Sequence, residues 1–179
     1  MWQVHMKHLY PTPADAKLRF NHSKRVAKLC QRLVGDMVCV DKDKMYICGI
    51  IHDMYKFLDN KTHDYMAGSW LENLVLIYDR ELLPEWEKYI AAVKFHSQIP
   101  SDNESLARMI LYEADKLDKL DLSYIRDSVK VSHKYETEND AIDHAIEKIN
   151  RIKHRTSPRF DSIKSELLTK CLNKIKRKK

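Results

Sequence analysis

Glycine and proline are scarce in this chain, and their scarcity constrains the fold more than any other feature of the sequence. Three glycines and five prolines occur among 179 residues, too few for the many tight turns of a β-rich fold. Alanine, leucine, lysine, glutamate, methionine and arginine recur instead, and these side chains lose little rotamer freedom in a helix. The sequence therefore predicts an all-α protein.

Apolar residues recur at helical spacing in successive segments. Four residues at positions i, i+4, i+7 and i+11 share one helix face: His22, Val26, Leu29 and Leu33. Further helices are expected to hold residues 43–57, 66–77, 85–96, 106–117, 140–153 and 158–175, with Ser101 or Asp102 as the N-cap of the helix that includes Leu106. No repeat or linker interrupts these segments. We therefore expect a single domain over 1–179, with a core at about 18–122, C-terminal helices at about 123–175 and a basic tail at 174–179.

Positive charge is concentrated at the C-terminal end of the chain. The formal net charge is +6, and the last ten residues carry six Lys or Arg and no acid, which leaves the rest near neutrality. A basic run of this kind is typical of a solvated terminus, and its alternative is a salt-sensitive attraction to nucleic acid. We favour the solvated terminus and expect no nucleic-acid partner.

The cysteines and the apolar runs indicate the cellular compartment of the protein. The four cysteines form no closely spaced pair, which is typical of reduced thiols in the cytosol. Residues 1–10 lack the apolar stretch of a secretory signal, and no apolar run approaches the roughly 20 residues that cross a bilayer. We therefore expect a cytoplasmic protein that does not enter a membrane.

Histidine and aspartate side chains stand on the apolar faces of three predicted helices. His22 shares its face with the core, His52 and Asp53 follow an apolar run directly, and Asp115 lies within another amphipathic segment. Buried carboxylates are costly unless they are paired, hydrogen-bonded or bound to metal. Two imidazoles and two carboxylates suit Mn, Fe, Co, Ni or Zn. The sequence therefore predicts a divalent transition-metal site with mixed nitrogen and oxygen ligands.

The order of these residues resembles a known signature. His22, the doublet of His52 and Asp53, and the distant Asp115 reproduce the H…HD…D pattern of the HD superfamily of metal-dependent phosphohydrolases, over about residues 18–122. The resemblance implies a single HD-domain helical bundle in which these four residues hold metal. It also implies that a metal-activated water cleaves a phosphate ester or anhydride of a nucleotide-like small molecule.

Two further histidines bear on the number of metal ions. Bimetallic members of the superfamily carry two histidines between the HD doublet and the final aspartate, and His63 and His96 occupy that interval. The resemblance thus implies one or two ions. The alternative to a second ion is a single ion, with His96 supporting a ligand or binding phosphate.

Lys56 and Asp53 are the candidate catalytic residues. Lys56 follows Asp53 by three residues and returns to nearly the same helix face, where its ammonium would neutralise charge on a phosphoryl group. The alternative is a solvated lysine at a helix end. The HDxxK pattern with intervening histidines looks most like the dinucleoside-polyphosphate hydrolases. Other open interpretations are a nucleoside monophosphate phosphatase, a phosphodiesterase and a non-catalytic nucleotide-binding sensor module.

Three neighbouring residues are given more ordinary roles. Gly49, one turn before Asp53, would let another backbone or a ligand approach closely. Asp118 and Asp121 are interpreted as surface or helix-capping carboxylates, although Asp118 lies one turn from Asp115. The oligomeric state has no signature in the sequence.

Overall fold

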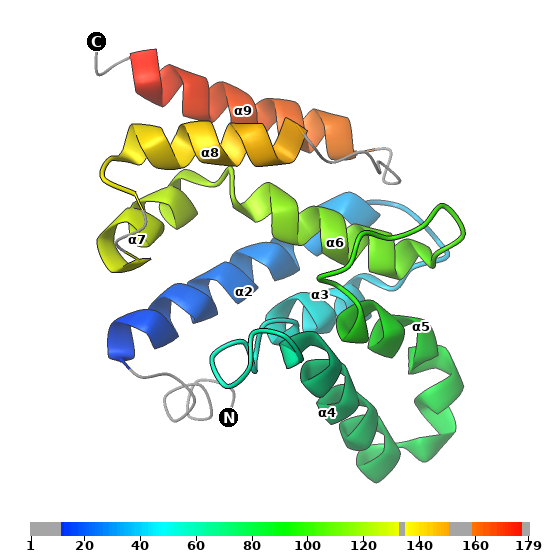
Figure 1. Cartoon of the computed structure of the whole chain (residues 1–179). Coiled ribbons are helices and arrows are strands. Elements are labelled where there is room, and N and C mark those ends of the chain that lie inside the picture. Colours follow the sequence, from blue (N-terminus) through cyan, green and yellow to red (C-terminus); the bar gives the residue numbers. More distant parts are fainter. Residues whose placement is uncertain (1–11, 133–134, 151–158, 177–179) are drawn as a thin grey trace.

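The computed structural model describes residues 12–132, 135–150 and 159–176. Every regular element within these ranges is helical, so the predicted all-α class is confirmed. The elements are α2 (Pro13–Val34), α3 (Lys42–Ile51), α4 (His63–Tyr78), the short 3-10 helix η1 (Arg80–Leu82), α5 (Leu83–Lys94), α6 (Leu106–Asp118), α7 (Leu122–Ser132), α8 (Glu138–Asn150) and α9 (Phe160–Lys176), as Figure 1 shows. None of the described helices is long and apolar enough to cross a membrane.

Helix α2 begins and ends with standard capping chemistry. The Thr12 hydroxyl accepts a hydrogen bond from the Asp15 amide, and Pro13 occupies the first helical position, where a backbone N–H is not needed. Gly35 ends the helix with φ of 54°, in the left-handed region that glycine adopts without strain. These local signals fix the length of the helix that runs through the centre of the molecule.

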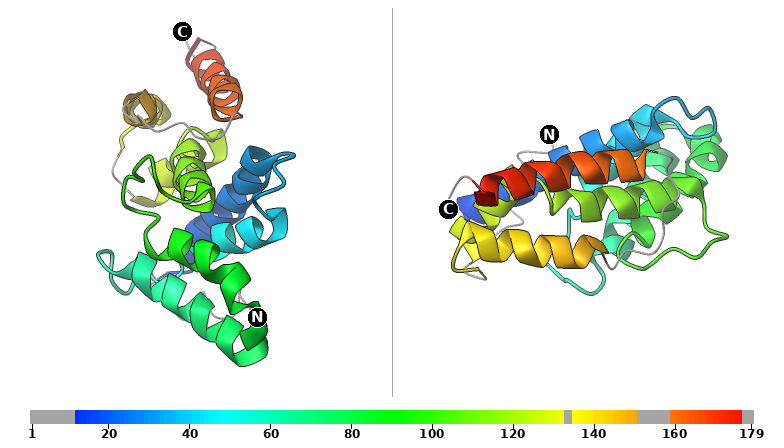
Figure 2. Two further views of the ribbon diagram at one scale, coloured as in Figure 1. Left: turned by 90° about the vertical axis from the view of Figure 1, so that its right-hand side faces the viewer. Right: turned by 90° about the horizontal axis from the view of Figure 1, so that it is seen from above.

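The remaining helices surround α2. It packs against α3, α6 and α7, and the predicted apolar face is buried, with Val26 and Leu33 fully inaccessible. Helices α4 and α5 pair at one end of the molecule, and α8 and α9 lie together at the other (Figures 1 and 2). The site described below lies between these ends, where α2, α3 and α6 meet.

Gly49 sets the distance between α2 and α3. A Cβ atom at this position would lie 2.7 Å from the backbone nitrogen of Ala27, so only glycine permits the two helices to cross this closely. The expectation of a close backbone approach is confirmed. As a consequence, the rings of His22 and His52 lie with their centroids 5.1 Å apart.

Two predicted helix boundaries are wrong. The helix expected over 43–57 ends at Ile51, because the Gly49 carbonyl accepts a hydrogen bond from Nδ1 of His52 and the chain continues in tight i to i+3 turns. The N-cap of α6 is Ser105, whose hydroxyl accepts from the Arg108 amide, rather than Ser101 or Asp102.

Candidate metal centre

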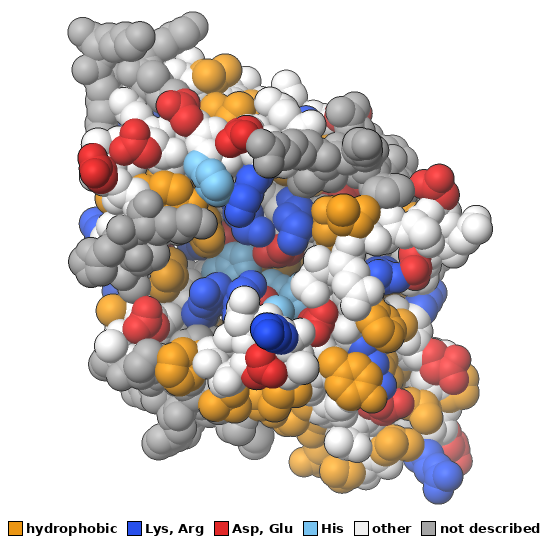
Figure 3. Space-filling model, viewed as in Figure 1, with side chains coloured by type: hydrophobic (Ala, Val, Ile, Leu, Met, Phe, Trp, Pro, Cys, Tyr) orange, Lys and Arg blue, Asp and Glu red, His pale blue; other side chains and the backbone are white. Residues whose placement is uncertain are grey.

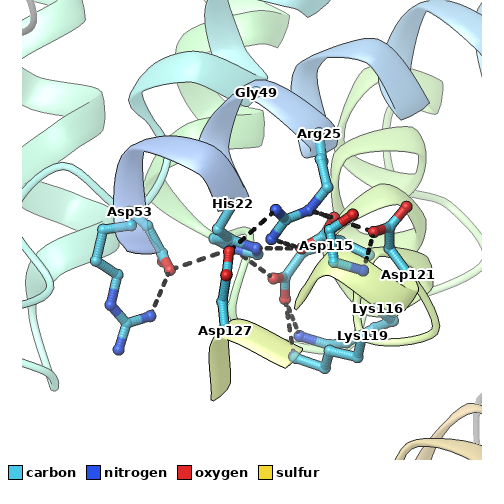
Figure 4. Close-up of polar contacts among 12 residues, drawn as sticks. His22, Arg25, Gly49, Asp53, Asp115, Lys116, Lys119, Asp121 and Asp127 are labelled. Carbon is cyan, nitrogen blue, oxygen red and sulfur yellow. Dashed lines mark hydrogen bonds and ion pairs between the residues drawn. The ribbon is translucent and has the colours of Figure 1, made fainter. Parts of the chain in front are cut away.

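Helix α2, the end of α3 and helix α6 bring the four predicted ligands together. His22, His52, Asp53 and Asp115 are all buried, at 4% exposure or less. Nε2 of His22 lies 3.5 Å from Oδ2 of Asp53 and 3.4 Å from Oδ1 of Asp115. Figure 4 shows His22 between these two carboxylates. Nε2 of His52 lies 3.9 Å from the same oxygen of Asp115.

A second group of side chains shares Asp53 with the first. His63 is the first residue of α4 and His96 follows the end of α5, and both are buried. Their Nε2 atoms lie 3.2 Å and 3.4 Å from Oδ1 of Asp53. Two sets of three potential ligand atoms therefore cluster within 4.8 Å: those of His22, His52 and Asp53, and those of Asp53, His63 and His96. Asp53 belongs to both sets: its Oδ2 faces His22, and its Oδ1 faces His52, His63 and His96.

Backbone carbonyls orient three of the four imidazoles. Nδ1 of His52, His63 and His96 lies 2.8–3.0 Å from the carbonyl oxygen three residues earlier in the chain. A carbonyl only accepts hydrogen bonds, so Nδ1 carries the proton and Nε2 presents its lone pair to the centre. This tautomer and orientation are the ones that a metal-binding histidine requires.

The buried lone pairs need a cation. Nε2 of His52 and of His63 has no hydrogen-bond partner among the described residues. Although Oδ1 of Asp53 lies 3.2 Å from Nε2 of His63, the proton on Nδ1 leaves two acceptors facing each other. Such an arrangement is costly in a buried site unless a positive ion lies between the acceptors. The donor set of imidazole nitrogens and carboxylate oxygens fits a divalent transition metal.

His22 is oriented by a carboxylate that the sequence interpretation placed elsewhere. Nδ1 of His22 lies 2.7 Å from Oδ2 of Asp118, and Nε of Arg25 donates to Oδ1 of the same residue at 2.7 Å. Asp118 is fully buried, so its interpretation as a surface or capping carboxylate is wrong. Its position one turn after Asp115 was the available signal. Asp121 does cap a helix, because its Oδ1 accepts from the Ser123 amide at 2.7 Å.

The two histidines of the first group differ in acidity. Burial lowers the pKa of His22, but hydrogen bonds with Asp115, Asp118 and Asp53 outweigh burial and raise it well above the usual value. Burial, helped by the neighbouring His96 and His22, lowers the pKa of His52 to about 3. His52 is therefore a neutral candidate ligand across the physiological range, whereas at His22 a metal ion would compete with a proton.

Cations flank both carboxylates. Burial raises the pKa of Asp53 and of Asp115, yet neighbouring imidazole and lysine groups, together with hydrogen bonding to His22, outweigh burial and hold both pKa values well below the usual range. Nζ of Lys56 lies 3.0 Å and 2.8 Å from the two Asp53 oxygens, and Nη1 of Arg19 lies 3.5 Å from Oδ2. On the other side, Lys116 and Lys119 contact Oδ2 of Asp115 at 2.5 Å and 3.4 Å.

The arrangement has a clear chemical consequence. Figure 3 shows histidine side chains at the bottom of a hollow that Lys and Arg side chains surround. Of these cations, the sequence interpretation singled out Lys56 and missed Arg19, Lys116 and Lys119. Arg19 lies three residues before His22 and Lys119 four residues after Asp115, spacings that could have identified both, whereas Lys116 follows Asp115 directly. A buried donor set beneath a cationic rim is suited to an anion that reaches a metal ion.

Comparison with known proteins gives one match. The protein-family model described as the HD domain matches residues 19–120, a segment that includes all six candidate ligands. No curated protein and no solved structure matches the chain.

Proposed function

The chain belongs to the HD-domain family of metal-dependent phosphohydrolases, and we propose that it hydrolyses a phosphate ester or anhydride of a nucleotide-like small molecule. The observation that carries this proposal is that Asp53 is shared by two buried groups whose imidazole nitrogens all converge on it. Two ions on either side of one carboxylate are the arrangement that many phosphate-cleaving centres use.

The proposal assigns each ligand to an ion. His22, His52, Asp53 and Asp115 would hold the first ion, and Asp53 together with His63 and His96 would hold the second. A divalent transition metal, Mn, Fe, Co, Ni or Zn, supplies Lewis acidity when bound, because it activates water as a nucleophile and withdraws charge from a phosphoryl oxygen.

The side chains of the rim bind and neutralise the substrate. Lys56 and Arg19 stand on the Asp53 side of the centre, and Lys116 and Lys119 stand on the Asp115 side. Positive groups on both sides match a substrate that carries phosphates on both sides of the scissile bond. We therefore favour a phosphate anhydride, with a dinucleoside polyphosphate as the leading candidate, over a nucleoside monophosphate.

Elemental analysis combined with a phosphate-release panel tests the proposal. The purified chain, incubated with Mn, Fe, Co, Ni or Zn, is expected to hold two ions and to hydrolyse dinucleoside polyphosphates faster than mono- or cyclic nucleotides. Asp53→Ala should lose both ions and the activity. Asp43→Ala, an exposed change in the first turn of α3, the helix that precedes Asp53, is the matched control and should lose neither.

The other outcomes are equally informative. A chain that binds no metal under these conditions contradicts the proposal. A metal-loaded chain that binds nucleotides tightly without turnover indicates a sensor module instead. Preference for a monophosphate or a cyclic nucleotide would replace the favoured substrate and keep the metal-dependent chemistry.

A further inference from the structure

A cavity of about 230 Å³ opens beside the metal centre. Two residues of α2, Arg19 and His22, form part of its wall, and His22 is also a candidate metal ligand. The cavity and the centre are therefore separated by no more than one imidazole ring. A molecule in the cavity would be in position to extend a phosphate group to the metal ligands.

Apart from Lys119, the rest of the wall lies outside the segment that matches the HD domain. That match ends at residue 120, whereas the other side of the cavity is formed by α7, α8 and their connection, including Tyr124, Tyr135 and Ala145. Helix α7 packs against both α2 and α8. The C-terminal segment therefore completes a cavity that the matched part of the chain only begins.

Charge is placed at the end of the cavity that faces the metal ligands. Arg19 and Lys119 line the cavity, and each also contacts a carboxylate of the centre, Asp53 and Asp115 respectively. Their side chains remain partly exposed, at 34% and 26%. Two accessible cations at this junction are suited to a phosphate that joins a group in the cavity to the metal centre.

Aromatic and apolar groups line the remainder of the cavity. The ring centroids of Tyr124 and His22 lie 5.7 Å apart, and those of Tyr135 and His144 lie 5.5 Å apart. Ala141 and Ala145 on α8 are buried and add small apolar side chains to the wall. Flat aromatic surfaces beside small aliphatic ones favour a planar ring system, because stacking on aromatic side chains stabilises any nucleobase.

The volume limits what the cavity holds. Pockets that enclose a whole drug-sized ligand usually measure roughly 300–1,000 Å³, and this cavity, at about 230 Å³, is smaller. One ring system fits, and a complete nucleoside polyphosphate does not. The phosphates of such a ligand would have to lie outside, at the cationic junction and the metal centre.

We propose that this cavity binds the nucleobase of a nucleotide substrate, so that the segment formed by α7 and α8 determines which nucleotides the metal centre hydrolyses. The inference rests on the proposed function, and it adds a binding site and a substrate class to it. The base lies among Tyr124, Tyr135 and His144, and the adjoining phosphate lies between Arg19 and Lys119.

Filling the cavity tests the proposal. Ala145→Phe places a ring in the cavity from α8, a helix that supplies no candidate metal ligand. The Michaelis constants of the variant are compared with those of the parent for ATP, GTP, CTP, UTP and diadenosine tetraphosphate. Inorganic tripolyphosphate, measured as substrate or as competitive inhibitor, is the reference that lacks a base. Asp143→Phe, on the exposed side of the same helix, is the matched control.

The expected result separates the two kinds of ligand. Ala145→Phe raises KM for the preferred nucleotides by about tenfold or more, the order expected when a stacked base is lost. It leaves the metal content and the binding of tripolyphosphate unchanged, and Asp143→Phe behaves like the parent. A folded, metal-loaded Ala145→Phe protein whose KM values are unchanged, or rise equally for tripolyphosphate, overturns the proposal.

Two further measurements keep the test decisive. If Ala145→Phe does not fold, Tyr135→Ala removes one aromatic wall without crowding the cavity, and the same outcomes apply to it. If the parent hydrolyses none of the panel, the proposed function fails. Calorimetric titration of the parent and of Ala145→Phe with the same nucleotides then tests separately whether the cavity binds a base. Binding that only the parent shows supports the base site, and equal or absent binding overturns it.

Discussion

The imidazoles of the candidate metal centre are oriented in two different ways. By this criterion the centre has one half that the backbone orients, with His52, His63 and His96, and another half that a side chain orients, with His22. His52, His63 and His96 lie at or just beyond helix ends, and the Nδ1–H of each donates a hydrogen bond to a carbonyl three residues earlier in the chain. His22 lies in the interior of α2, and its Nδ1–H donates a hydrogen bond to Asp118, which is 96 residues later in the sequence. One half is thus positioned by local backbone geometry, and the other depends on a long-range contact between side chains.

The difference follows from where free carbonyls are found. The last carbonyls of a helix have no partner within it, so His52 and His96, just beyond the ends of α3 and α5, can use one of them. His63 begins α4 and uses the Asn60 carbonyl of the preceding turn. In the interior of a helix the carbonyls already accept from amides four residues later. His22 therefore needs an acceptor from another helix, and Asp118 supplies it while Arg25 neutralises the buried charge. Helix position alone determines which kind of support a metal-binding histidine requires.

Removing one ligand from each half is the most severe test of this comparison. His22→Ala and His63→Ala should each remove one ion per chain and lower kcat/KM by about a thousandfold, since an ion in such a centre contributes several kcal/mol. Elemental analysis and steady-state kinetics measure both effects. If His63→Ala retains the full metal content of the parent, the second group holds no ion and the single-ion interpretation replaces it.

Asp118→Asn weakens the hydrogen bond from a side chain that orients His22 alone among the four imidazoles. An amide offers one acceptor atom where both His22 and Arg25 donate, so the imidazole loses its fixed orientation. We expect metal affinity to fall by about ten- to a hundredfold, measured by competition with a chelator. Asp121→Asn keeps the acceptor that caps α7 and serves as the control. Equal affinity in the two variants would contradict the dependence of His22 on Asp118.

Gly49→Ala tests the contact that places the two halves against each other. The added Cβ would lie 2.7 Å from the Ala27 backbone nitrogen, and neither backbone can move without separating α2 from α3. We expect the free energy of unfolding to fall by about 1–3 kcal/mol, measured by urea denaturation of the metal-free protein. Ile47→Ala, on the exposed side of α3, should change it by less than about 0.5 kcal/mol.

Ser97→Ala should have the smallest effect. The Ser97 hydroxyl donates to Asp64 and so links the residue after His63 to the residue after His96. Because carbonyls still hold both imidazoles, the loss of this partly buried contact should weaken metal binding by about threefold or less. A loss as large as that of Asp118→Asn would show that the second half also relies on side chains.

The sequence predicted what depends on local pattern. Helical periodicity placed His22 on the buried face of α2, and the order of His22, His52, Asp53 and Asp115 indicated the family. It did not predict the end of α3 at Ile51, because the apolar spacing continues to Tyr55 while the His52 side chain takes the Gly49 carbonyl. That competition arises from a side-chain conformation and not from spacing.

Features that join distant helices were also beyond the sequence. The burial of Asp118 depends on Arg25 reaching it from α2. The cavity exists because α7 packs against α2 and α8 packs against α7. The apolar spacing within 122–150 marks a buried face on each helix but does not identify the helices that cover it. Pairings of this kind are settled by tertiary packing, which overrides the preferences of each segment.

The six candidate ligands come from five separate segments: α2, the end of α3, the start of α4, the end of α5, and α6. Each ion bound by its share of them would act as a cross-link between parts of the chain that are otherwise joined only by packing. At an ion concentration a hundred times its Kd, such a link adds about 2.7 kcal/mol to the free energy of unfolding. The melting temperature of this protein would then report how fully its centre is loaded, and metal starvation would shorten the lifetime of the whole fold as well as stop its chemistry.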